Sequence, residues 1–158
     1  MSLLTPEECI AHCRAELEDR PLLDSLLAAA ESAVAGHLNR AVFASGAELE
    51  AAQAALPDAA GVAQDAYETA ISGAALLLNA AARDMAISVA IERLAEARTG
   101  FARTLHGVVA NPRILAAVRL TLGNLYANRE QVIVGASVSE LPQGVPELLR
   151  PDRRTMMP

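Results

Sequence analysis

The sequence predicts an all-α protein, a helical bundle with a long alanine-rich helical hairpin and a short extended segment near its C-terminus. Hydrophobic residues make up 53% of the 158 residues and aromatic residues only 3%. Alanine and leucine, two of the strongest helix formers, supply much of the hydrophobic fraction. Apolar residues recur every three or four positions, as one face of a helix requires. The length suits one domain over residues 1–158.

Two helices are expected in the first 40 residues. The segment Thr5–Glu8 reads as a capping box with proline at the first helical position, and it predicts a helix over residues 6–15. A second helix is expected over residues 20–38, and Asn39 can adopt the left-handed turn that ends it. Its predicted buried stripe comprises Leu23, Leu26, Leu27, Ala30, Val34 and Leu38.

The middle of the chain predicts a helical hairpin. A short helix is expected over residues 46–55, and Asp58 is expected to cap the long helical region that follows. Two apolar stripes with a mean spacing of about 3.5, typical of helices packed side by side, change face near residues 79–84. We expect an antiparallel turn near residues 78–80, with one long helix as the alternative. The stripes are Tyr67, Ile71, Ala74, Leu78, Ala81 and Met85, then Ile87, Ile91, Leu94, Arg98, Phe101 and Leu105.

The C-terminal third predicts one long helix and then a change of pattern. Gly107 is expected to end the hairpin, and Asn111 followed by Pro112 starts the long helix. Its buried stripe is Ile114, Leu115, Val118, Leu122 and Leu125. The β-branched run Val132–Val134 predicts extended chain, and residues 147–150 can form one helical turn.

Charge and hydropathy exclude several classes of partner. The formal net charge is −6, and all 13 basic residues are arginine. An acidic chain does not fit a clamp on a nucleic-acid backbone, although DNA can slide past such a surface. The absence of lysine excludes a phosphate-binding loop of the G-x-x-x-x-G-K type. No apolar run approaches the length of a membrane span, and the N-terminal residues do not resemble a signal peptide, so we expect an intracellular protein.

Residues capable of catalysis or metal binding form no complete motif. Cys9, His12 and Cys13 form a C-x-x-H-C pattern, but a structural zinc site needs four ligands and no second pair exists. We therefore expect reduced, buried cysteines, with a metal site as the alternative. No nucleophile elbow of the G-x-S-x-G type is present. We expect no enzymatic activity, no cofactor and no metal.

Residues 113–154 contain an ordered series of elements. An apolar helix is followed by Tyr-x-Asn-Arg-Glu, a Val/Gly-rich strand, Leu-Pro, and Leu-Leu-x-Pro-x-Arg. This series resembles the C-terminal part of the head–tail connector (adaptor) proteins of long-tailed double-stranded DNA bacteriophages. The N-terminal segments Leu4–Glu8 and Asn39–Ala41 are also similar to that family. The matched C-terminal residues are Tyr126, Asn128, Arg129, Glu130, Val134, Gly135, Leu141, Pro142, Gly144, Val145, Leu148, Leu149, Pro151 and Arg153.

The chain departs from the family pattern in two places. Residues 43–107 are a long helical insertion where typical members have a shorter link. Asp152 stands where the family commonly has an aromatic residue, so we expect a weaker last anchor there.

The resemblance implies a structural protein without catalytic activity, from a phage or prophage. Subunits of this family assemble in the host cytoplasm into a ring of about a dozen copies joined by heterologous interfaces. The ring lies at the head–tail junction of the virion, between the portal protein and the next head-completion or tail protein. DNA passes through its channel without specific binding. A stand-alone helical protein-binding module or regulator is the alternative.

The resemblance also implies an interface in the C-terminal segment. An extended Val132–Val134 strand can add to a sheet of a partner. Arg129 either forms a local ion pair or contacts an acid of a neighbouring subunit. Tyr126 is expected to be a core anchor with its hydroxyl at the surface. Two pairs, Leu141–Pro142 and Leu148–Leu149, are left open between intramolecular packing and a role in binding the portal protein or a neighbouring subunit. The expected interface residues are Tyr126, Asn128, Arg129, Glu130, Val132, Ile133, Val134, Gly135, Leu141, Pro142, Leu148, Leu149 and Arg153.

Overall fold

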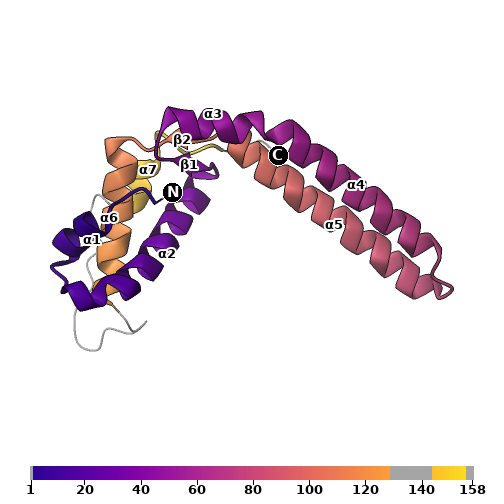
Figure 1. The fold of residues 1–158 in the computed structure, drawn as a ribbon, viewed down its shortest axis with the longest axis horizontal. Helices are drawn as coiled ribbons and strands as arrows, with labels where there is room; N and C mark the ends of the chain where they lie inside the picture. Colours follow the sequence, from indigo (N-terminus) through magenta and orange to yellow (C-terminus); the bar gives the residue numbers. More distant parts are fainter. Residues whose placement is uncertain (1, 129–143, 156–158) are drawn as a thin grey trace. The chain divides into compact units, whose positions relative to one another are not determined.

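A computed structural model describes residues 2–128 and 144–155, and it confirms the predicted all-α class (Figure 1). The helices are α1 (Pro6–Cys13), the 3-10 turn η1 (Leu17–Asp19), α2 (Arg20–Leu38), α3 (Gly46–Ala54), α4 (Leu56–Ala75), α5 (Ala80–Leu105), α6 (Pro112–Ala127) and α7 (Val145–Leu149). The two short strands are β1 (Val42–Phe43) and β2 (Val108–Val109). The expected extended segment at Val132–Val134 lies outside the described residues.

The chain divides into two separately packed units. The first, which we call the core unit, combines Met1–Gly46 with Val108–Pro158. The second, the hairpin unit, is Ala47–Gly107. The expected single domain over residues 1–158 therefore contains two compact bodies. The hairpin unit lies within residues 43–107, the range that the sequence analysis expected to be a helical insertion.

The core unit is built around the packing of α2 against α6, with α1 and α7 completing it. The predicted stripes of both long helices are confirmed, with Leu26, Leu115 and Leu125 half-buried at their edges. Cys9 also lies in this core, as expected of a small buried thiol. The fully buried or nearly buried residues of the core are Leu4, Cys9, Leu23, Leu27, Ala30, Val34, Leu38, Ile114, Ala117, Val118, Leu122 and Leu149.

Side-chain caps set the ends of these helices where the sequence predicts them. Thr5 and Glu8 form the reciprocal capping box, with the Glu8 amide 3.2 Å from the Thr5 hydroxyl. The pKa of the Glu8 carboxyl lies below its usual value, mainly because the Thr5 amide donates to it and also because Arg119 is close. Asn111 accepts from the amides of residues 113 and 114, each at 3.0 Å. Helix α1 ends two residues earlier than expected, because Arg14 takes the left-handed conformation (φ 51°).

A parallel pair of short strands joins the two points where the hairpin unit enters and leaves the core unit. Val42 pairs with Val108 and Phe43 with Val109. The Val108 amide donates to Ala41 O at 2.9 Å, and the Ala110 amide to Phe43 O at 2.8 Å. These hydrogen bonds help to offset the entropic cost of bringing the two ends of the long insertion together. The predicted extended conformation at Val108–Val109 is confirmed.

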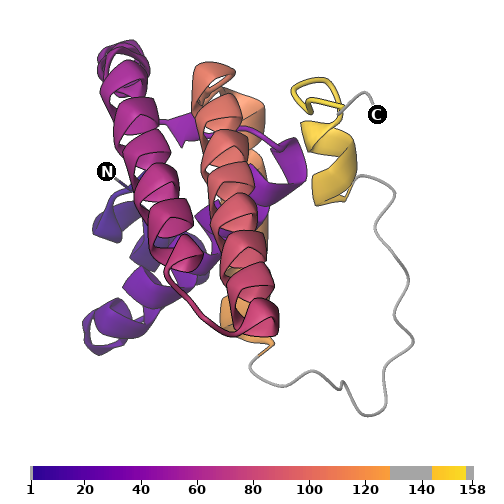
Figure 2. The ribbon, with the colours of Figure 1, turned by 90° about the vertical axis from the view of Figure 1, so that its right-hand side faces the viewer.

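Helices α4 and α5 form the antiparallel hairpin that the sequence predicts, and they lie side by side in both ribbon views (Figures 1 and 2). The turn follows α4, and Asn79 caps α5 by accepting from the Ala82 amide at 3.0 Å. The alternative of one long helix is wrong. Asp58 is not a cap, because α4 begins at Leu56 with Pro57 in its first turn, where a proline needs no donor. His106, rather than Gly107, is the C-cap of α5.

The predicted stripes of the hairpin are only partly buried. Within α4 and α5 the fully buried residues are Ala74 and Ala90. Leu78 is 102% exposed, Met85 66%, Leu105 55% and Ile91 49%. The spacing identified the apolar faces correctly, but two helices can bury only the sides that touch each other.

Leu149 supports the prediction that α7 is an integral part of the core unit. Leu149→Ala should lower the free energy of unfolding by about 2–5 kcal/mol, because truncating a buried leucine loses apolar contact and leaves a cavity. Leu120→Ala, at a position 45% exposed, is the matched control and should cost less than about 1 kcal/mol. Urea denaturation followed by circular dichroism measures both. Equal effects would show that α7 does not pack as described.

Candidate assembly interface

The described end of the C-terminal motif folds back onto the core unit. Helix α7 packs against α6 and α2, and Leu149 is 0% exposed while Leu148 is half-buried. The sequence left open whether Leu149 packs within the chain or binds a partner. In the structure its side chain packs within the chain. Its role in this chain is to hold the motif on the core unit, and the partner-binding role does not apply to its side chain.

Asp152 is an anchor of the chain that follows α7. Its Oδ2 accepts from Asn111 Nδ2 at 3.2 Å and lies 3.3 Å from Arg113 Nη2. Its carbonyl oxygen accepts from Arg40 Nη1 at 3.2 Å. Next to it, the Arg154 amide donates to Leu38 O at 3.0 Å. A polar network therefore holds the chain at Asp152.

The end of α6 is also tied to the core unit. Tyr126 is half-buried, and its hydroxyl donates to Asp19 Oδ2 at 2.7 Å. This is the surface-reaching core anchor that the sequence predicts. Asn128 is the C-cap of α6, and its side chain donates to Asn124 O at 3.2 Å. The described chain that precedes residue 129 and the described chain that follows residue 143 therefore belong to the same packed body.

The remaining expected interface residues divide into two groups. Arg153 is exposed, directly after the anchored Asp152. The others lie outside the described residues, and they are Arg129, Glu130, Val132, Ile133, Val134, Gly135, Leu141 and Pro142. In the described chain, α6 ends at Ala127 and α7 begins at Val145.

The structure adds an apolar surface that the sequence analysis missed. In the hairpin unit, Leu76 is 82% exposed and Val62 is 69% exposed, in addition to the exposed members of the predicted stripes. The sequence does contain a signal for this exposure. Its two middle helices carry more apolar residues than two helices can bury against each other. Single exposed apolar residues are ordinary on soluble proteins, so only those that share one face of the hairpin bear on binding.

One side of the hairpin carries a shallow apolar groove. It runs between α4 and α5, and we call it the alanine groove. It is lined by Ala63, Ala66, Tyr67, Ala70, Ala90, Arg93, Leu94 and Ala97. Small side chains let another helix approach closely, which suits helix-to-helix packing better than enclosure of a small molecule.

Among residues 2–128 and 144–155, no group of three or more His, Cys, Asp or Glu is arranged to hold a metal ion. Burial raises the pKa of the Cys9 and Cys13 thiols, which lowers their reactivity. No helix within this described part is long and apolar enough to cross a bilayer.

Comparison with known proteins finds no relative: no protein-family model, no curated protein and no solved structure matches the chain.

The polar network at Asp152 predicts a measurable loss of stability on substitution. Asp152→Ala should lower the free energy of unfolding by about 1–2 kcal/mol, because it leaves Asn111 and Arg113 without their shared acceptor. Arg153→Ala, at the exposed neighbouring position, should change it by less than about 0.5 kcal/mol. Thermal and urea unfolding of both variants test the network. A neutral Asp152→Ala would mean that the chain after α7 is not held by it.

Proposed function

We propose that this chain is a structural subunit of a phage head–tail junction. It oligomerises into a ring at the portal vertex, extends the DNA channel and joins the head to the next head-completion or tail protein. The observation that carries the proposal is the ordered series of elements over residues 113–154. That series resembles the connector family in sequence, and its described ends have a clear structural role in this chain.

The anchoring of those ends supports an assembly role for what lies between them. Tyr126, near the end of α6, and Leu149, in α7, hold these two parts of the motif on one core. The described chain before residue 129 and after residue 143 therefore packs on the same core unit. An attached segment loses less conformational freedom on binding than a free tail does. This favours a role in which Val132–Val134 adds to a neighbouring subunit.

The charge of the chain is compatible with a DNA channel. Nineteen acidic residues against 13 arginines give a net charge of −6. A channel through which DNA must move should not hold phosphates by clustered cations, since such contacts produce strong binding. The net charge therefore fits passage of DNA better than its capture.

The second candidate is a stand-alone helical binding module or regulator. The exposed leucines Leu76 and Leu78 favour it, because an apolar tip can bind another protein without any ring. Genome context separates the two candidates. A connector gene should lie downstream of genes for a portal protein, a protease and a major capsid protein.

Electron microscopy of the purified protein tests the proposed ring. Concentrated wild-type protein should form rings in negative stain. A variant with Val132, Ile133 and Val134 all replaced by serine should lose them while keeping its helical circular dichroism. Val138→Ser is the matched control within the same segment and should keep the rings. Wild-type protein that stays monomeric with portal protein added, or a triple variant that forms normal rings, contradicts the proposal.

A further inference from the structure

The two sides of the α4–α5 hairpin are unlike. Ala90 is buried in the seam between the helices. One residue turns an α-helix by about 100°, so Ile91 lies on one side of the seam and Arg93 on the other. Arg93 borders the alanine groove. The side that carries Ile91 we call the isoleucine side, and it comprises Ile71, Ile87, Ile91 and Leu105.

The residues of the isoleucine side recur at the spacing typical of core residues, but they are not buried as core residues are. Its α5 members, residues 87, 91 and 105, belong to the stripe that repeats every three or four positions. Yet Ile91 is 49% and Leu105 55% exposed, while Ile71 and Ile87 are half-buried. Leaving this apolar surface in water is unfavourable by about 25 cal/mol per Å². The pattern therefore indicates a surface that another chain covers.

We propose that the isoleucine side of one copy packs into the alanine groove of a neighbouring copy. The occupant of the groove is thus a second copy of this chain, and the contact is heterologous, as a ring requires. The inference rests on the proposed function, because it supplies an interface for the same ring. The isoleucine and leucine side chains of one face can act as ridges, and the five alanines of the groove leave room for them between Tyr67 and Leu94.

One side of the hairpin offers most of the surface area that such a contact needs. Helix α5 has 26 residues and α4 has 20. At about 1.5 Å per residue and about 10 Å per helix in width, one side of the hairpin offers roughly 700 Å². A standard stable interface buries about 800 Å² on each partner, so hairpin packing can supply most of one.

One acidic residue of α4, Glu68, and one arginine of α5, Arg93, can form a complementary pair between copies. The charged residues of α4 are all acidic, namely Asp58, Asp65 and Glu68, whereas every arginine of the hairpin helices lies on α5. Glu68 follows Tyr67 by one residue and so lies toward the isoleucine side. Tyr67 and Arg93 both line the alanine groove, which places Glu68 and Arg93 at one level along the hairpin. Copies packed side by side at equal height bring Glu68 of one close to Arg93 of the next.

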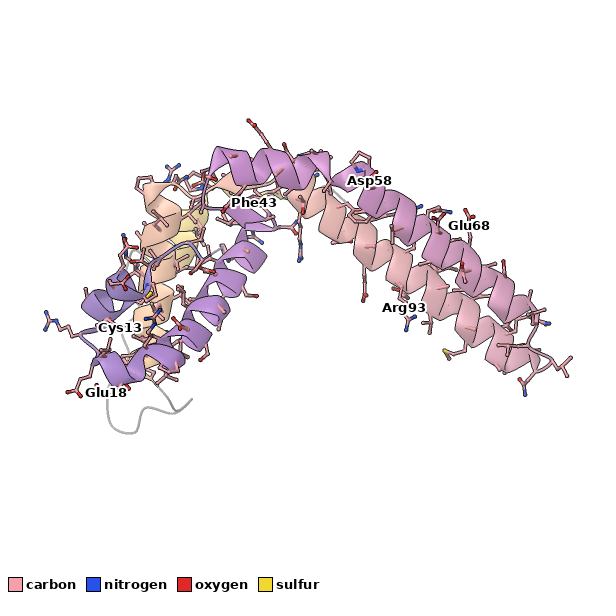
Figure 3. The ribbon with its side chains drawn as sticks, viewed as in Figure 1. Cys13, Glu18, Phe43, Asp58, Glu68 and Arg93 are labelled. Carbon is pink, nitrogen blue, oxygen red and sulfur yellow. The ribbon has the colours of Figure 1, made fainter. Side chains whose placement is uncertain are left out.

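Within one copy these two groups do not meet. Figure 3 shows Glu68 on α4 and Arg93 on α5, and the two side chains do not point toward each other. Neither residue takes part in an ion pair among the described residues, and Glu68 accepts instead from Gln64 Nε2 at 2.9 Å. Both charges are therefore available to a neighbour.

A charge-swap experiment on the full-length chain tests the contact. Glu68→Arg and Arg93→Glu each place like charges across the interface, so each should raise the protein concentration needed for assembly by about tenfold or more. An equimolar mixture of the two variants should assemble nearly as well as wild type, because alternating copies restore opposite charges at every contact. Glu92→Arg, an exposed charge reversal on α5 away from both sides, is the matched control and should leave assembly unchanged. Sedimentation velocity over a dilution series at low salt measures wild type, the two single variants, their mixture and the control.

The outcomes separate this contact from the ring itself. Wild-type rings that persist in both single variants overturn the hairpin contact and leave the ring intact. A mixture that assembles no better than its components, or an equal loss in Glu92→Arg, also overturns the contact. Wild-type protein that forms only dimers or open chains, with recovery in the mixture, supports the contact and contradicts the ring. Wild-type protein that stays monomeric at every concentration contradicts both.

Discussion

Two packed helices can bury only the sides on which they touch, and this constraint determines what the α4–α5 hairpin can be. The seam of the hairpin is lined by alanine, with Ala74 and Ala90 fully buried, so the helices approach closely but remove little apolar area from water. Larger residues such as Ile91 and Leu105 remain at the edges. Such a hairpin gains stability from any partner that covers these edges, and we propose that this partner is a second copy.

The core unit has the opposite character. Its long helices α2 and α6 bury continuous stripes of large residues, and α7 adds Leu149 to the same core. The short β1–β2 pair closes the core unit at the point of insertion. The core unit therefore does not depend on the hairpin unit for its apolar burial. In a ring, this division would let the core unit present the C-terminal motif while the hairpin unit adds contact area between copies.

Local chemistry made most of the fold predictable from the sequence. Asn39 and Asn111 mark helix ends because their side chains and their tolerance of the left-handed conformation leave few alternatives. The predicted cap at Asp58 failed because helix α4 already begins at Leu56, and a proline in its first turn does not interrupt it. Periodicity identified the apolar face of α5, yet it carries no information on whether that face is covered by the same chain or by another.

The candidate site was less predictable for a related reason. Tyr126 was correctly expected to anchor α6, because the ring of a tyrosine favours burial while its hydroxyl needs a hydrogen-bond partner. The network of Asp152 with Asn111 and Arg113 joins residues about 40 positions apart, and only the packed structure brings them together. The alanine groove combines two helices in the same way.

Hydrogen exchange of the full-length protein over a dilution series measures the central claim most directly. If neighbouring copies cover the hairpin, amide protection in α4 and α5 should rise steeply with assembly, while protection in α2 and α6 should already be high in the dilute monomer. Equal protection of both units in the monomer, with no further change in α4 and α5 on assembly, would contradict the account.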